Sequence, residues 1–219
     1  RGNADYSNVT TIGIDETSRK GHNYITNVVD LEQSRVIYIS TGKDAKTVEN
    51  FVADFKAHKG NPDRIELATC DMSAAFKKGI CDNLGNAEMI IDKFHVIKLA
   101  NEAVDQVRRE EVKEIPALKH SRYIWLKNKV NLTESQKITF QVLSKMNLKT
   151  SRAYAMKTSL QDIYNLAENR DEAEPLLRRL CSWMKRSRLA PMKTLANTIQ
   201  EHWDNLLNYF EFRRTNVSA

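Results

Sequence analysis

Two aspartates, Asp15 and Asp71, stand in segments that otherwise have the character of buried β-strands. Asp15 follows Ile12 and Ile14 in an alternating run, and Asp71 ends a strand-like run directly after Cys70. A carboxylate inside a sheet is costly unless it is paired or bound to a metal ion. If the two strands are neighbours, the carboxylates meet at one edge of the sheet, and at about 4–6 Å they repel each other and favour a shared cation. Because oxygen ligands without a His or Cys cluster suit magnesium or manganese, we predict a metal-dependent catalytic pair.

A simpler interpretation of the same residues stays open. Many surface strands end in aspartate, so Asp15 and Asp71 can also be ordinary solvated residues. A second unit, Asp92-x-x-His95, closes the next strand-like run. A histidine beside a metal ion and a phosphate can donate to that phosphate or orient a ligand. His95 can equally be a buried residue that is hydrogen-bonded to Asp92, so we treat these two as supporting residues.

The elements that must position these residues are indicated by hydrophobic periodicity. Runs rich in Val, Ile, Tyr and Thr, which are typical of strands, cover residues 10–17, 24–31, 35–41, 64–72 and 88–94. Apolar residues at helical spacing cover residues 44–58 and 73–84. The order is therefore β-β-β-α-β-α-β, and right-handed crossovers place the fourth strand beside the first. We predict an α/β fold with a mixed five-stranded sheet and flanking helices.

The second half of the chain changes class, because from about Val96 nearly every segment has helical period. Thr133 and Gln136 have the spacing of a capping box ahead of Ile138 and Val142. The three tryptophans are expected to pack between these helices. We predict a core, an all-helical insertion and the start of a return to the core, over residues 1–112, 113–195 and 196–219.

The chain has 34 Lys and Arg against 28 Asp and Glu, a net charge of +6. This balance favours an anionic partner such as nucleic acid, although an ordinary solvated surface explains it equally well. Lysine and arginine bind phosphates without reading sequence. The clusters that we single out as DNA-binding candidates are Lys185, Arg186 and Arg188, and Arg19 with Lys20. The three cysteines show no C-x-x-C spacing, which indicates a reduced cytosolic protein without a structural zinc site.

Three phrases of the sequence resemble the transposases of bacterial insertion sequences, most closely the IS-L-three family. They are Gly13-Ile14-Asp15-Glu16-Thr17, Cys70-Asp71-Met72-Ser73 and Ile91-Asp92-Lys93-Phe94-His95-Val96. The resemblance extends along the whole chain and implies an RNase H-like core with a DDE active site, in which Asp15 and Asp71 are the first two acids. It also implies two Mg²⁺ or Mn²⁺ ions in the complete site, DNA as the partner, a homo-oligomer on that DNA and a location at the bacterial nucleoid. Neither a membrane nor a small-molecule substrate is expected.

The family's third acid is a glutamate on a helix that follows the all-helical insertion. In the family pattern it lies just beyond a segment like Arg213-Arg214-Thr215-Asn216, so we expect it after Ala219 and expect these residues alone to be inactive. Two other functions stay open. A stand-alone RNase H-like nuclease or resolvase needs a further acid near Asp15 within this chain. A DNA-binding or assembly module needs no catalytic acid at all.

Overall fold

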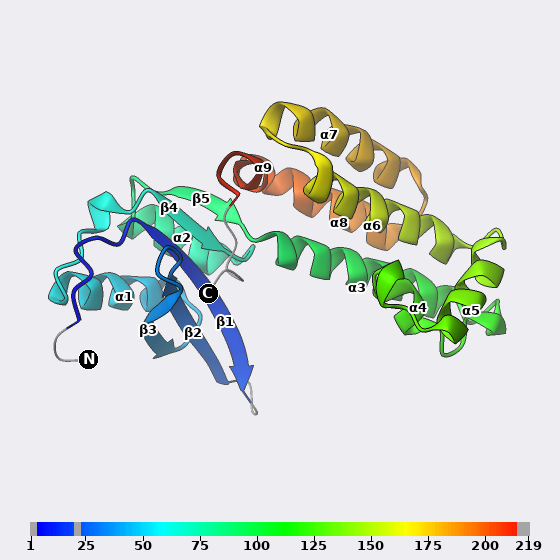
Figure 1. The fold of residues 1–219 in the computed structure, drawn as a ribbon, viewed down its shortest axis with the longest axis horizontal. Coiled ribbons are helices and arrows are strands. Elements are labelled where there is room, and N and C mark those ends of the chain that lie inside the picture. The colour runs from blue at the N-terminus through cyan, green and yellow to red at the C-terminus, as the bar shows by residue number, and fades with distance from the viewer. Residues whose placement is uncertain (1–3, 20–22, 214–219) are drawn as a thin grey trace. The chain divides into compact units, whose positions relative to one another are not determined.

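The computed structural model describes residues 4–19 and 23–213, which form two compact units (Figure 1). The first unit contains the described residues up to His95 together with those from Asp204 onward. The second unit contains Val96–Trp203. The domain limits indicated by the sequence, at residues 112 and 195, stay a prediction.

The first unit is built on one sheet in the order β3-β2-β1-β4-β5. Its strands are β1 (Thr11–Arg19), β2 (Asn23–Asp30), β3 (Arg35–Thr41), β4 (Leu67–Cys70) and β5 (Glu88–Ile91). β1, β2 and β3 form an antiparallel meander, whereas β4 runs parallel to both β1 and β5. The predicted mixed five-stranded sheet with flanking helices is confirmed, is consistent with an RNase H-like core, and has the fourth strand beside the first.

Two helices, α1 (Ala45–Ala57) and α2 (Ala74–Asn83), pack against each other and against the sheet. The side chain of Asp44 accepts a hydrogen bond of 3.0 Å from the first turn of α1, as an N-cap residue does. In α2, a Cβ atom added at Gly79 would lie only 2.7 Å from the side chain of Val48 in α1. Glycine therefore allows the close approach of these two helices.

A last helix, α9 (Trp203–Phe212), returns the chain to the first unit beside the edge strand β5. The amide of Asn208 donates a hydrogen bond of 2.9 Å to the backbone carbonyl of Met89. Leu206 and Leu207 are fully buried. The helical segment between β5 and α9 is therefore inserted between two elements of the first unit.

The described residues of the second unit form helices joined by turns and loops, with no strand among them. Its helices are α3 (Lys93–Glu111), which begins in the first unit, α4 (Arg122–Leu126), α5 (Glu134–Ser144), α6 (Lys149–Leu166), α7 (Arg170–Arg186) and α8 (Ala190–Glu201). The predicted capping box of Thr133 and Gln136 is confirmed at the start of α5. Trp125 is buried, and its ring meets that of Tyr154 at 5.6 Å. None of the described helices combines the length and the apolar character needed to cross a bilayer.

Two buried charged side chains link the helices of the second unit. Glu111 accepts hydrogen bonds of 2.7 and 2.8 Å from the backbone N–H groups of Lys149 and Thr150, and a third from the Thr150 hydroxyl. It caps the N-terminus of α6, where unpaired N–H groups and the helix dipole favour a carboxylate. Lys157 of α6 donates to two carbonyl groups at the C-terminal end of α4, at 2.8 and 3.3 Å. Burial lowers the pKa of Lys157 to about 8.

Several strand limits differ from the prediction, and the largest differences are at the start of β4 and the end of β5. β4 begins at Leu67 and not at residue 64, because Pro62–Arg64 form a 3-10 turn, and proline has no N–H group for a strand ladder. β5 ends at Ile91 and not at residue 94, because α3 begins at Lys93.

Candidate active site

Asp15 in β1 and Asp71 directly after β4 occupy matching positions along two neighbouring parallel strands. β1 and β4 are in register through Gly13 and Thr69. Asp15 comes two residues after Gly13, and Asp71 comes two residues after Thr69. Because positions two apart along a strand share a face, the register carries both aspartates to the same level, at the C-terminal end of β4.

A third aspartate reaches this level from β5. Cys70 and Ile91 are partners in parallel register, and the residues that follow them are Asp71 and Asp92. The Asp92 side chain is only 2% exposed, and its Oδ1 accepts a hydrogen bond of 3.0 Å from the backbone N–H two residues later. This carboxylate therefore caps the start of α3. The expectation that Asp92 and His95 close the fifth strand is therefore wrong. Asp92 follows the strand, and His95 lies in the first turn of α3.

His95 couples these aspartates electrostatically. Its Nε2 lies 3.8 Å from Oδ1 of Asp15, and its Nδ1 lies 3.7 Å from Oδ2 of Asp92. Both distances are too long for hydrogen bonds, so the interaction is one of charge. The pKa of His95 is raised, mainly by Asp92; partial burial opposes this rise, and Asp15 and Asp71 add to it. The protonated imidazole is thus favoured beside the three carboxylates.

Asp15 and Asp71 each keep one carboxylate oxygen available. Oδ1 of Asp15 accepts from the N–H of Glu16, and Oδ1 of Asp71 from the N–H of Ser73, both at 2.8 Å. Within the described ranges, Oδ2 of neither aspartate has a hydrogen-bond partner. The Asp15 side chain is 44% exposed, and Asp71 is half-buried. Solvent therefore reaches these two side chains, whereas Asp92 is enclosed.

Two carboxylates are the right chemical type of ligand for a divalent ion, but they are fewer than such an ion needs. Carboxylate oxygens are the ligands that Mg²⁺ and Mn²⁺ prefer. Across residues 4–19 and 23–213, no three His, Cys, Asp or Glu side chains are arranged to hold a metal ion. Asp15 and Asp71 fit as two ligands of an ion whose remaining ligands are water, a substrate phosphate or a further acid. Burial raises the pKa of the Cys70 thiol, so this neighbour stays protonated and is a poor ligand.

The basic residues predicted to bind DNA lie at the end of α7. Lys185 and Arg186 belong to its last turn, and Arg188 follows with a left-handed backbone φ of 63°. All three are exposed, and Lys185 donates a hydrogen bond to a glutamine side chain of α8. Lys20 and the side chain of Arg19 lie outside the described residues.

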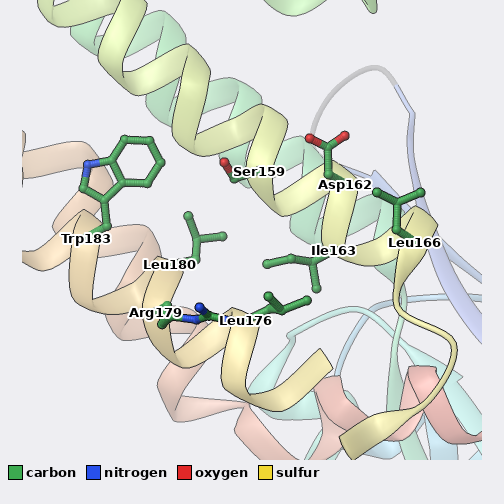
Figure 2. Close-up of a pocket in the computed structure, with 8 residues that line it drawn as sticks. All are labelled: Ser159, Asp162, Ile163, Leu166, Leu176, Arg179, Leu180 and Trp183. Atoms are coloured by element: carbon green, nitrogen blue, oxygen red, sulfur yellow. The ribbon is translucent and has the colours of Figure 1, made fainter. Parts of the chain in front are cut away.

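Trp183 differs from the expectation that the tryptophans form helix-packing core. Its side chain is 41% exposed and stands at one end of a groove between α6 and α7 (Figure 2). The groove has a volume of about 490 Å³ and is lined mainly by apolar side chains such as Leu166, Leu176 and Leu180. The indole is therefore accessible on the same helix as Lys185.

Sequence reasoning missed one cluster of charged residues in the helical unit. Asp105 of α3 forms ion pairs with Arg108, Arg109 and Arg122. Two of these partners could have been found, because residues three and four positions apart share a helix face. Arg122 approaches from α4, and no local spacing predicts that contact.

Comparisons with known proteins match nearly the whole chain to one group. A family model described as a transposase, of the DDE type and the IS-L-three group, matches residues 12–219. The transposase for insertion sequence element IS1557 of Mycobacterium tuberculosis is 27% identical over 90% of this chain and 50% of that protein. The transposase for insertion sequence element IS1001 of Bordetella parapertussis is 29% identical over 73% of this chain and 41% of that protein. The chain thus spans half or less of the length of these relatives. It belongs to the IS-L-three family of DDE transposases.

Proposed function

We propose that this chain supplies the catalytic core of a transposase that cleaves and joins DNA strands when an insertion sequence moves. Asp15 and Asp71 are the first two acids of the active site and the metal ligands within this chain. The observation that carries the proposal is that the register of two parallel strands places both aspartates at the same level, where each has a carboxylate oxygen that accepts no hydrogen bond from a described residue. Membership of the family supports it, as do the names of the curated relatives.

The complete site is proposed to take two Mg²⁺ or Mn²⁺ ions, which when bound would activate a water or a 3′-hydroxyl and stabilise the leaving oxygen of a phosphodiester. Asp15 and Asp71 would hold these ions, because a shared cation relieves the repulsion between the two carboxylates. When it is protonated, His95 places a positive charge at the same edge and can donate a hydrogen bond to a phosphate oxygen. Buried Asp92, 3.7 Å from the imidazole, attracts its protonated form.

A third acid is proposed to come from outside the described residues, because they bring no third ligand to the pair. On that basis the 219 residues are proposed not to cleave DNA by themselves. Lys185, Arg186 and Arg188 are proposed to bind DNA phosphates, and so are Arg19 and Lys20. The active form is proposed to be a homo-oligomer on DNA.

Strand cleavage and strand transfer by the full-length protein with Mg²⁺ test this proposal. Asp71→Asn keeps the size of the side chain and removes its charge. Cleavage should fall more than about a hundredfold, beyond the usual cost of changing an outer partner of a metal ligand. Asp82→Asn is the matched control, because Asp82 is exposed on α2 and pairs with Lys78 at 3.4 Å. This control should retain wild-type cleavage.

Two outcomes would contradict the assignment. Cleavage that survives Asp71→Asn would exclude the catalytic role of this residue. Cleavage by the wild type that is never followed by joining would favour an RNase H-like nuclease or resolvase over a transposase.

A further inference from the structure

One buried carboxylate in the helical unit already has its neutralising partner. Asp105 lies on α3, and its side chain is 11% exposed. Arg108, one turn further along α3, donates to Oδ1 of Asp105 through Nε at 2.8 Å and through a terminal nitrogen at 2.7 Å. Arg108 is equally buried, so the two form a neutral pair. Any further cationic side chain beside Asp105 therefore gives the cluster a net positive charge.

Two more arginines nevertheless contact the other oxygen of Asp105. Nε of Arg109 lies 3.5 Å from Oδ2, and Nε of Arg122, from α4, lies 3.4 Å from the same atom. In the described part of the chain, neither guanidinium group forms a hydrogen bond or an ion pair with any residue other than Asp105, and Arg122 also lies over the ring of Tyr123 at 5.7 Å. The side chains are 67% and 55% exposed, so solvent and ligands can reach them.

A tie between α3 and α4 does not by itself explain this arrangement. Three guanidinium groups around one carboxylate leave an excess of two positive charges, and like charges held together repel. Glu110, which Gln106 contacts at 3.5 Å, and Lys113 line the same surface hollow as Arg109. These two offset each other. The cluster therefore favours a second anion between Arg109 and Arg122.

We infer that Arg109 and Arg122 form a clamp for phosphates of the DNA backbone. A planar guanidinium offers two parallel N–H groups to two phosphate oxygens, whereas a lysine ammonium acts as a point charge. Asp105 holds both side chains in place before the ligand arrives, which lowers the ordering cost of binding. The contact is independent of base sequence. The identification of the polyanion as DNA rests on the proposed function.

The double variant Arg109→Lys/Arg122→Lys tests the clamp, because it keeps the charge and removes the planar fork. Binding of a labelled DNA duplex to the 219-residue chain is measured by fluorescence anisotropy over a range of salt concentrations. The Kd should rise about tenfold, the cost of losing a hydrogen bond to a charged group, with little change in the salt dependence. Alanine at both positions should also reduce the slope of log Kd against log salt by about 2.

A matched pair of substitutions separates the clamp from a general effect of arginine. Arg152 lies on α6 and Arg178 on α7, where Arg178 pairs with Glu174. Arg152→Lys/Arg178→Lys should leave the Kd unchanged. Wild-type affinity in Arg109→Lys/Arg122→Lys, or an equal loss in both double variants, would overturn the inference.

Asp105→Asn provides a test of opposite sign. It adds one positive charge to the protein, so charge alone predicts tighter DNA binding. The clamp predicts weaker binding, because Arg109 and Arg122 lose their anchor. Circular dichroism and thermal unfolding check the fold of this variant. If it does not fold, the DNA affinity of Arg109→Lys/Arg122→Lys, which changes only exposed side chains, decides whether the clamp exists.

The inference and the proposed function fail in different ways. DNA binding that depends on Arg109 and Arg122, without metal-dependent cleavage by the full-length protein, would overturn the proposed function alone. Cleavage that depends on Asp71, with wild-type affinity in Arg109→Lys/Arg122→Lys, would overturn the clamp alone. A wild-type chain that binds no DNA would also overturn the clamp.

Discussion

Charged side chains are treated in opposite ways in the two units of this molecule. In the helical unit, Glu111 accepts three hydrogen bonds and Lys157 donates two, so each buried charge is compensated inside the protein. At the edge of the sheet, Asp15 and Asp71 each keep an oxygen without a partner among the described residues. The helical charges therefore stabilise the fold, whereas the sheet carboxylates repel one another, and the proposed cation would relieve that repulsion. Uncompensated charge on a rigid scaffold is what a catalytic site requires and a structural site avoids.

Glu111→Ala should have the largest effect on stability. It leaves the N–H groups of Lys149 and Thr150 unpaired at the start of α6, and hydrogen bonds to a charged group are each worth about 1.5–3 kcal/mol. We expect the free energy of unfolding, measured by urea denaturation, to fall by about 3 kcal/mol. Glu114→Ala is the control, because Glu114 is exposed and pairs with the side chain of Lys149 at 3.3 Å. A similar loss in both variants would remove the contrast between compensated and surface charges.

Lys157 should make stability depend on pH in the alkaline range. Its pKa is lowered from 10.5 to about 8 by burial. Between these values the unfolded chain binds more protons than the folded chain, so the free energy of unfolding rises with pH. Measured against Lys157→Met, the wild type should gain about 2 kcal/mol between about pH 7 and pH 10.

The control for this pH effect is Lys145→Met, since Lys145 is exposed. The difference between wild type and Lys145→Met should stay constant over the same range. A constant difference for Lys157→Met as well would mean that the carbonyl groups of α4 and the ring of Tyr154, 4.7 Å away, keep the amine charged.

The smallest effect on stability is expected at the sheet edge, where removing a charge should stabilise the fold instead of destabilising it. Asp71→Asn, measured in the presence of EDTA, should raise the free energy of unfolding by about 0.5 kcal/mol, because it relieves repulsion between partly solvated carboxylates. Asparagine retains the oxygen that accepts from the N–H of Ser73. Asp82→Asn should lower stability slightly, since it loses the attraction of Lys78. A loss above about 1 kcal/mol for Asp71→Asn would place this residue with the structural charges of the helical unit.

The order of the elements and the neighbouring positions of Asp15 and Asp71 could be predicted from the sequence. Alternating apolar residues mark the first strand, and right-handed crossovers place the strand before Asp71 beside it. The end of the fifth strand could not be found in this way. Phe94 after Ile91 extended the expected strand across two charged residues, and the helix start is set by the hydrogen bond that Asp92 accepts, which hydrophobicity does not record.

Periodicity also failed to show what covers a helix face. Ile138 and Val142 share one side of α5 as predicted, yet they are 63% and 60% exposed. A repeat along the chain identifies residues with a common direction, but burial depends on segments that are distant in sequence. The contact of Arg122 with Asp105 escaped prediction for the same reason.

The short link from β5 to α3 has a consequence for how this chain tolerates insertions and deletions. Asp92 directly follows one element and caps the next, and His95 lies three positions later on the first turn. One extra residue between them would rotate the imidazole by about 100° around the helix axis and carry it away from Asp15. Phe94, which is 45% exposed, can be exchanged for other side chains. The length of this link, in contrast, should not vary among functional homologues.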